Sequence, residues 1–502
     1  MATVTWTGAV STTYSTDGNW DTGSKPTSSD DVIIANVTND CVLTGSPTVN
    51  SWTVQSGARF NGNTETITVV GENSSGFAID IDGEVVGTTT NFTVETPAAT
   101  NIDLKATSGN VRHVTINHAS CAAAIAGGFM TITGNLTITA GSLNTGGNDL
   151  TVTGTTTIGP ASGAADQATL TCNASTVSLG SGITSSAYGL YVNQGGTFTG
   201  GSGTHTLGSV VVRNNAAAKC TLTSGVTTIN GEHGGDGRAI NIEGTGATFD
   251  DGNGTVTFTF AGTTKIALEG NSLYNVIVND SSASVEYIGD TTIDNDLTVT
   301  AGKFRYNNFH DLTVTGNVSV TGILGHPTTT TTSNCTFGSL TINSGGEYKA
   351  PSGTTTITNE TSGGFAINND GTFTHNKGTV KIDYDTSTNL DLTGTGSVDL
   401  YNLIVDSDAT VGYNASVIEN NLTKLGSGLM RPTGDSGRNL TVKGTFLMQA
   451  GSFGRGANDT HTNTFGNIVV EGGELILTGG GGSGKTIVNG SFRNVGGTIT
   501  SH

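Results

Sequence analysis

The chain has little positive charge and no long apolar run, and each shortage excludes a class of protein. Its 502 residues contain 20 Lys and Arg against 40 Asp and Glu, a formal charge of −20. Because phosphates would be repelled by this balance, we expect neither nucleic acid nor an anionic membrane as a partner. No stretch approaches the roughly 18 apolar residues of a membrane helix. Residues 1–20 lack the basic and apolar segments of a secretory signal, so we expect synthesis in a cytoplasm without general export.

Cysteine is scarce, and its spacing matches no disulfide or metal-binding motif. The five cysteines are an odd number, and they form neither a C-x-x-C motif nor a Cys/His pair at zinc spacing. A full set of internal disulfides is therefore excluded, and we expect small buried side chains in a reducing compartment. The sequence predicts no metal site and no cofactor. The cysteines are Cys41, Cys121, Cys172, Cys220 and Cys335.

Helical periodicity is also missing, and alternation of apolar and polar residues takes its place. "NLTITAGSL" (135–143) and "NDLTVTAGKF" (295–304) place Leu, Ile and Val on one face and Thr and Asn on the other. This pattern predicts half-buried β-strands. The 75 glycines, with Asn and Asp, supply frequent turns between them.

Internal repeats indicate how these strands are arranged. "GRAINIEGTGATFDDGNGTV" (237–256) resembles "GFAINNDGTFTHNKGTV" (364–380), and the match extends over blocks 237–302 and 364–427. Because register is kept over more than 120 residues, we predict an all-β, elongated, right-handed parallel β-solenoid with coils of roughly 20 to 25 residues. The alternative is a series of antiparallel β-sandwiches.

The first 50 residues differ from the rest and predict a separate domain. Residues 1–50 contain two of the three tryptophans, and we interpret them as an N-terminal cap or docking region before a solenoid at 51–502. Trp6 and Trp20 would cover the first coil, and Asp30 and Asp31 would start its first long strand.

One motif matches a nucleotide-binding loop. Gly479 to Thr486 spells G-x-x-x-x-G-K-T, the P-loop pattern with Lys485 at its lysine. A working P-loop needs a helix after the lysine, whose amides hold the phosphates. The segment that follows is β-branched and broken by glycines, so we expect a turn between strands and no nucleotide binding.

A second motif gathers polar side chains in one loop. "GEHGGDGR" (231–238) offers Glu232, His233, Asp236 and Arg238, which could hold a metal or act as acid and base. We favour a polar turn between coils, because the loop directly precedes the repeat unit. No catalytic, metal or cofactor residue is therefore assigned.

The remaining patterns favour structural roles. Outward aspartates in "IDID" (79–82) and "KIDYD" (381–385) are ordinary on strands, although a glycan-cleaving site assembled from distant coils stays open. Irregular T-x-T pairs do not form an ice-binding array. The Asn-x-Ser/Thr sites predict strand entries, not glycan attachment, and the repeat-unit tyrosines predict core or stapling residues. The T-x-T pairs include Thr298 with Thr300 and Thr313 with Thr315. The Asn-x-Ser/Thr sites include Asn135, Asn421 and Asn439, and the repeat-unit tyrosines are Tyr188, Tyr191, Tyr274 and Tyr401.

The opening "TWTG…GNWDTGSKPTSSDDVII", with the "GTFTHNKGTV" and "LTVTAG" units, resembles Gly/Thr/Asn-rich β-solenoid proteins of tailed-phage virions and related bacterial surface proteins. The resemblance implies a non-enzymatic structural protein of the virion, a projecting fibre, spike or decoration. Its partners would be other virion proteins or copies of itself in a homo-oligomeric or multi-copy assembly, and host surface glycans. Two alternatives remain: an extracellular bacterial adhesin or matrix fibre, and a polysaccharide-degrading tailspike.

Overall fold

A computed structural model describes most of the chain. The described residues are 1–87, 89–104, 111–160, 167–183, 188–215, 217–306, 309–325, 332–392, 399–414, 416–433, 439–454, 460–478 and 484–501. They form two compact units, one of residues 1–260 and 264–269 and the other of residues 261–263 and 270–502.

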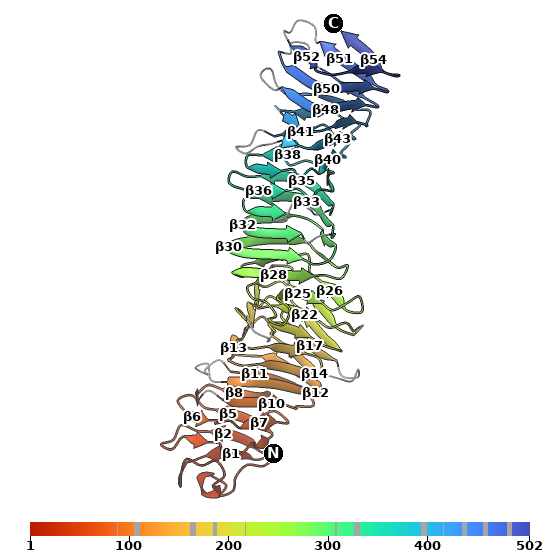
Figure 1. The fold of residues 1–502 in the computed structure, drawn as a ribbon. Helices are drawn as coiled ribbons and strands as arrows, with labels where there is room; N and C mark the ends of the chain where they lie inside the picture. Colours follow the sequence, from red (N-terminus) through yellow and green to blue (C-terminus); the bar gives the residue numbers. More distant parts are fainter. Residues whose placement is uncertain are drawn as a thin grey trace. The chain divides into compact units, whose positions relative to one another are not determined.

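Both units are built almost entirely of β-strands. The described residues contain strands β1 to β54, one 3-10 turn at Asp17–Asn19 and no α-helix. Strands make up 55% of the described residues and form about 18 stacked turns of a parallel β-solenoid, which confirms the predicted fold. Figure 1 shows the strands of each unit lying one above another.

Each strand pairs in parallel with its equivalent one coil away. In the first unit, β2 (Asp31–Ile34) lies between β1 (Thr3–Trp6) and β5 (Ser51–Val54). In the second unit, β43 (Asn402–Val405) lies between β40 (Thr379–Ile382) and β46 (Leu422–Lys424). A series of antiparallel sandwiches is therefore wrong for this chain, because such sandwiches join neighbouring strands by hairpins.

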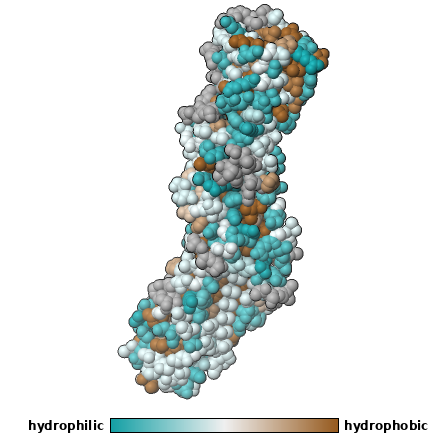
Figure 2. Space-filling view, in the orientation of Figure 1, coloured by the Kyte–Doolittle hydropathy of each residue, from teal (hydrophilic) through white to brown (hydrophobic). Residues whose placement is uncertain are grey.

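Alternation along each strand separates the interior from the surface. In β2 the side chains of Val32 and Ile34 are fully buried, whereas Asp31 and Ile33 are half-buried on the outside. Burial of each such apolar side chain contributes about 1.5–3 kcal/mol relative to exposure. The visible face in Figure 2 is mostly hydrophilic or neutral in hydropathy, as outward Thr, Ser and Asn require.

Aromatic rings close the N-terminal coil. Trp6 and Trp20, which we expected over the first coil, are both buried with ring centroids 5.1 Å apart. The ring centroid of Tyr14 lies 5.2 Å from that of Trp20 and 6.2 Å from that of Trp52 in β5. The buried Asn19 side chain accepts hydrogen bonds from two backbone amides and donates two more, so it fixes the loop that carries Trp20.

Asparagines at strand entries link successive coils. Each accepts, at Oδ1, the backbone N–H of a residue 20 to 24 positions further along the chain. The pairs are Asn135 with Thr155 at 3.0 Å, Asn421 with Thr445 at 2.9 Å and Asn439 with Thr462 at 2.7 Å. The Asn-x-Ser/Thr pattern thus has a structural cause: an asparagine cap followed by a threonine-bearing strand.

We expect the substitution Asn421→Ala to lower the free energy of unfolding of the second unit by about 1 kcal/mol, the usual contribution of one hydrogen bond. The amide of Thr445 would lose its acceptor. Asn421→Asp keeps the oxygen and should retain most of the stability. Urea unfolding followed by circular dichroism measures both, and equal losses would contradict a role for the acceptor.

Some interior positions carry ionisable or reactive groups. Lys424 aligns with Val299 in the duplicated block, and both are fully buried. Its ammonium donates to the carbonyl oxygens of Ser407 and Gly426, and burial lowers its pKa. His205 is also fully buried. All five cysteines are buried free thiols.

Candidate functional site

The segment that resembles a P-loop ends in a strand. Gly479 to Ser483 lie outside the described residues, but Lys485–Val488 form β52, which pairs in parallel with β50 (Thr462–Val470). The backbone N–H of Lys485 donates to the oxygen of His461 in the preceding coil. A strand therefore occupies the place where phosphate binding needs the first turn of a helix.

We expect Lys485→Ala to change the free energy of unfolding by less than about 0.5 kcal/mol, as for most exposed side chains. Folding and assembly should be unaffected. Equilibrium dialysis with ATP should detect no binding to either protein. ATP binding that the substitution abolishes would contradict this.

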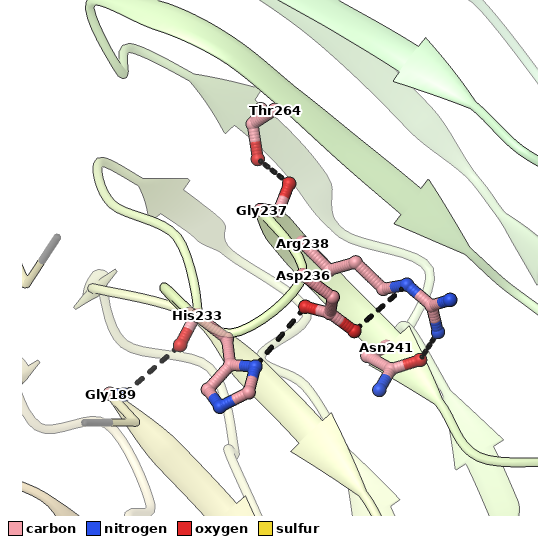
Figure 3. A network of polar contacts seen from close by, with 8 residues as sticks. Gly189, His233, Asp236, Gly237, Arg238, Asn241 and Thr264 are labelled. Carbon is pink, nitrogen blue, oxygen red and sulfur yellow. Dashed lines mark hydrogen bonds and ion pairs between the residues drawn. The ribbon is translucent and has the colours of Figure 1, made fainter. Parts of the chain in front are cut away.

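The polar loop 231–238 is a turn held by its own charged side chains. The N–H of His233 donates to the oxygen of Arg238 at 2.8 Å, which closes the turn before β25 (Arg238–Ile242). Asp236 lies between the two side chains: Oδ1 is 3.1 Å from Nδ1 of His233 and Oδ2 is 3.0 Å from Nε of Arg238. Figure 3 shows the imidazole and the guanidinium approaching this carboxylate from opposite sides. The guanidinium also donates to Oδ1 of Asn241 at 2.5 Å.

Three stacked rings hold this turn against the outside of the coil. Tyr188 lies between Tyr191 and His233, with centroid distances of 4.5 Å and 4.4 Å and nearly parallel planes. Tyr191 points outward from β19 (Leu190–Val192), which pairs with β22 (Val210–Val212), and β22 pairs in turn with β25 one coil further on. All three rings are half-buried. These rings lie at the surface and not in the core. Of the two roles expected for the repeat-unit tyrosines, core or staple, the position of Tyr188 and Tyr191 fits the staple.

Glu232 borders the same turn and is partly shielded from water. Burial raises the pKa of its carboxyl, Asp236 raises it further, and Lys265 opposes the shift. Oε2 of Glu232 is buried, and among the described residues it receives no hydrogen bond. The turn therefore presents one buried acceptor beside a carboxylate, an imidazole and a guanidinium.

Metal binding does not fit this turn. Both oxygens of Asp236 already face an imidazole or a guanidinium, and the positive charge of Arg238 would repel a cation at this carboxylate. Over the described ranges, one group of three possible ligands has its atoms within 4.8 Å of one another: Asp80, Asp82 and Asp103. Two of these come from the "IDID" segment, and Asp103 from the next coil.

Comparison with family models, curated sequences and solved structures gives a single result. No family model, curated protein or solved structure matches this chain. Within the described ranges there is also no helix long and apolar enough to span a membrane. Function must therefore be argued from the geometry of the chain itself.

A second polar cluster lies on the second unit. Glu419 follows β45 (Ser416–Ile418) and is 2.6 Å from the ammonium of Lys443 in the next coil. Burial and a hydrogen bond with Glu419 raise the pKa of Asp399, while Lys443 lowers the pKa of Glu419. The ring of Tyr401 lies 5.5 Å from His375 beside them. The two carboxyl groups therefore influence each other's pKa, and Lys443 forms an ion pair with Glu419.

The other sequence candidates are dispersed. In "KIDYD", Asp383 pairs with Lys381 at 2.8 Å, and Lys381 also contacts Asp406 at 3.0 Å. Thr313 has Thr292 and Thr336 as neighbours in the two adjacent coils, so threonines form a column across the coils. Three coils beyond Thr313 the same place is held by Lys381, which interrupts this column.

Sequence reasoning found the turn 231–238 but not its rings. Tyr188 and His233 are 45 residues apart, and no local pattern links them. No local pattern links Asp399 with Glu419 either. These two residues lie one coil apart, so the register of the repeats could have indicated that they are neighbours.

Proposed function

We propose that this chain is a non-enzymatic structural protein of a tailed-phage virion, a projecting fibre, spike or decoration. Its role is mechanical and adhesive: one end docks on the particle and the outer surface contacts the host. Its partners are other virion proteins or further copies of the same chain. The proposal rests on one observation above all, the stacking of coil on coil through parallel ladders in both units. Such stacks extend by repetition and present long surfaces.

The polar clusters support a non-enzymatic role. Glycosidases keep two carboxyl groups about 5 Å or more apart, on either side of a sugar bond. Glu419 is instead held by Lys443 at 2.6 Å, and it lies close enough to Asp399 to raise the pKa of that carboxyl. At the first unit, Asp236 is held between His233 and Arg238. These carboxylates hold the surface in place and leave little capacity for proton transfer.

Mass spectrometry of density-purified particles tests the proposal, using a culture that carries the coding sequence. The chain should copurify with virions at many copies per particle, and antibodies should label a projecting structure in electron micrographs. Recovery in the outer-surface fraction of uninfected cells, with none in particles, would support a bacterial adhesin instead. Release of reducing sugar from host polysaccharide would support a degrading spike and contradict a purely structural role.

A further inference from the structure

The turn 233–238 has two relatives in the same chain, at 73–77 and 361–365. In each turn the first N–H donates to the last carbonyl oxygen, at 2.8 Å, 2.9 Å and 2.8 Å respectively. In each, a glycine with positive φ comes before the last residue, at 67°, 81° and 78°. Each turn leads into a strand that begins with its last residue: β25, β8 (Phe77–Ile81) and β38 (Phe365–Asn369). The backbone of the turn is therefore a repeated element of the fold.

Only the copy at 233–238 carries a charged network. The relatives begin with Asn73 and Thr361 and end with Phe77 and Phe365, where this copy has His233 and Arg238. The side chains of Asn73 and Thr361 bond back to the amides of their own turns. The imidazole of His233 instead bonds to the carboxylate of Asp236. The copy at 233–238 is one residue longer than its two relatives, and its charged side chains take the place of their local caps.

The charges around this copy cancel. Arg213, Arg238 and Lys265 lie near Glu232, Asp236 and Glu243, three basic residues against three acidic ones, on a chain of net charge −20. A surface of this kind offers many donors and acceptors without a net field. It therefore suits an uncharged ligand that is rich in hydroxyl groups.

The rings complete the surface. The stack of Tyr191, Tyr188 and His233 is half-buried, with Tyr188 between the other two rings, and it lies beside the polar groups of the turn. Oε2 of Glu232, which receives no hydrogen bond from the described residues, is an acceptor at the border of the turn. Aromatic bodies beside a few convergent polar groups are typical of ligand sites.

We propose that Tyr188, Tyr191, His233, Asp236 and Arg238 form a binding surface for an uncharged oligosaccharide. Sugar hydroxyls bond to the carboxylate and guanidinium, and the C–H faces of the sugar contact the rings. The host envelope as the source of this sugar rests on the proposed function. The binding itself does not.

Titration calorimetry with full-length protein tests the surface. The probes are uncharged gluco-, galacto- and manno-oligosaccharides of four to six units, with polygalacturonate as the anionic comparison. At least one uncharged probe should bind, and Tyr188→Ala and Arg238→Phe should each weaken it by about tenfold or more. Arg238→Phe introduces the residue that ends both related turns, and its thermal midpoint checks that the variant still folds. Thr361→Ala, in a related turn, should leave binding unchanged.

The surface is not a saccharide site if no uncharged probe binds, if only polygalacturonate binds, or if both substitutions leave the affinity intact. Sugar binding by a protein that is missing from virions would uphold this surface and overturn the proposed function. Presence in virions without sugar binding would do the reverse.

Discussion

Acidification from pH 7 to pH 4 should destabilise the coils around His205 by about 3 kcal/mol. The imidazole is fully buried between Val177 and Thr227 of the adjacent coils, with the ring of Phe198 at 6.0 Å. Neither ring nitrogen forms a hydrogen bond of normal geometry with a described group. Burial lowers the pKa of His205 from 6.5 to about 4, and the backbone of Gly200 opposes the shift only in part.

The direction follows from proton binding. The unfolded chain takes up this proton near pH 6.5 and the folded chain only near pH 4, so the unfolded state binds more protons between these values. The stability is fully present above about pH 6.5 and is lost as the pH falls toward 4. A shift of this size corresponds to about 3 kcal/mol.

Urea unfolding and hydrogen exchange at pH 7, 5.5 and 4.5 measure the effect. Exchange should accelerate beyond its intrinsic pH dependence in β18 (Val177–Leu179), β21 (His205–Leu207) and β24 (Val226–Ile229). His205→Leu should remove most of this acid sensitivity, whereas His118→Leu should preserve it. An unchanged pH profile in His205→Leu would rule out the buried imidazole as the cause.

A single methyl group at Gly428 should cost about 3 kcal/mol of stability in the second unit. A Cβ at this position would lie 1.9 Å from the backbone oxygen of Ala409 in the preceding coil. Neither backbone can yield without disturbing the ladders on both sides, since Gly428 is bonded to Ser407 below and Ser452 above. Overpacking against rigid neighbours typically costs 1–3 kcal/mol, occasionally more.

Gly289→Ala is the matched control, because a Cβ there meets nothing within 4 Å. Its free energy of unfolding should change by less than about 0.5 kcal/mol. Chemical denaturation of both variants measures the difference. Equal losses would contradict contact between coils as the cause, because the lower entropy of the unfolded alanine variants acts in the stabilising direction.

The fold was predictable because its determinants repeat. Alternation in "NDLTVTAGKF" identifies strands, and the match of block 237–302 with block 364–427 indicates coils in register. Parallel stacking in the structure confirms both. The β-branched residues and glycines after Lys485 predicted that no helix follows the motif, and β52 begins at that lysine.

The candidate site was predictable only in part, because its parts do not repeat. The turn 231–238 stands out as a cluster of polar residues, but Tyr188 reaches His233 from outside the periodic strands. His205 occupies an inward position that valine and threonine hold in the adjacent coils, so alternation assigns the position without revealing the consequence of an imidazole there. Periodicity predicts whether a side chain points into the solenoid or toward solvent. Its pKa and its contacts also depend on side chains one coil away, which periodicity does not identify.

The five buried thiols also bear on how the protein is made. Burial raises the pKa of Cys121 to about 11 and those of Cys172 and Cys335 to about 12, and it raises those of Cys41 and Cys220 further. Since the thiolate is the reactive form, exchange with disulfides is suppressed at neutral pH. Maturation therefore needs no oxidase and no isomerase. The folded protein should therefore pass from a reducing to an oxidising environment without gaining a cross-link between these thiols.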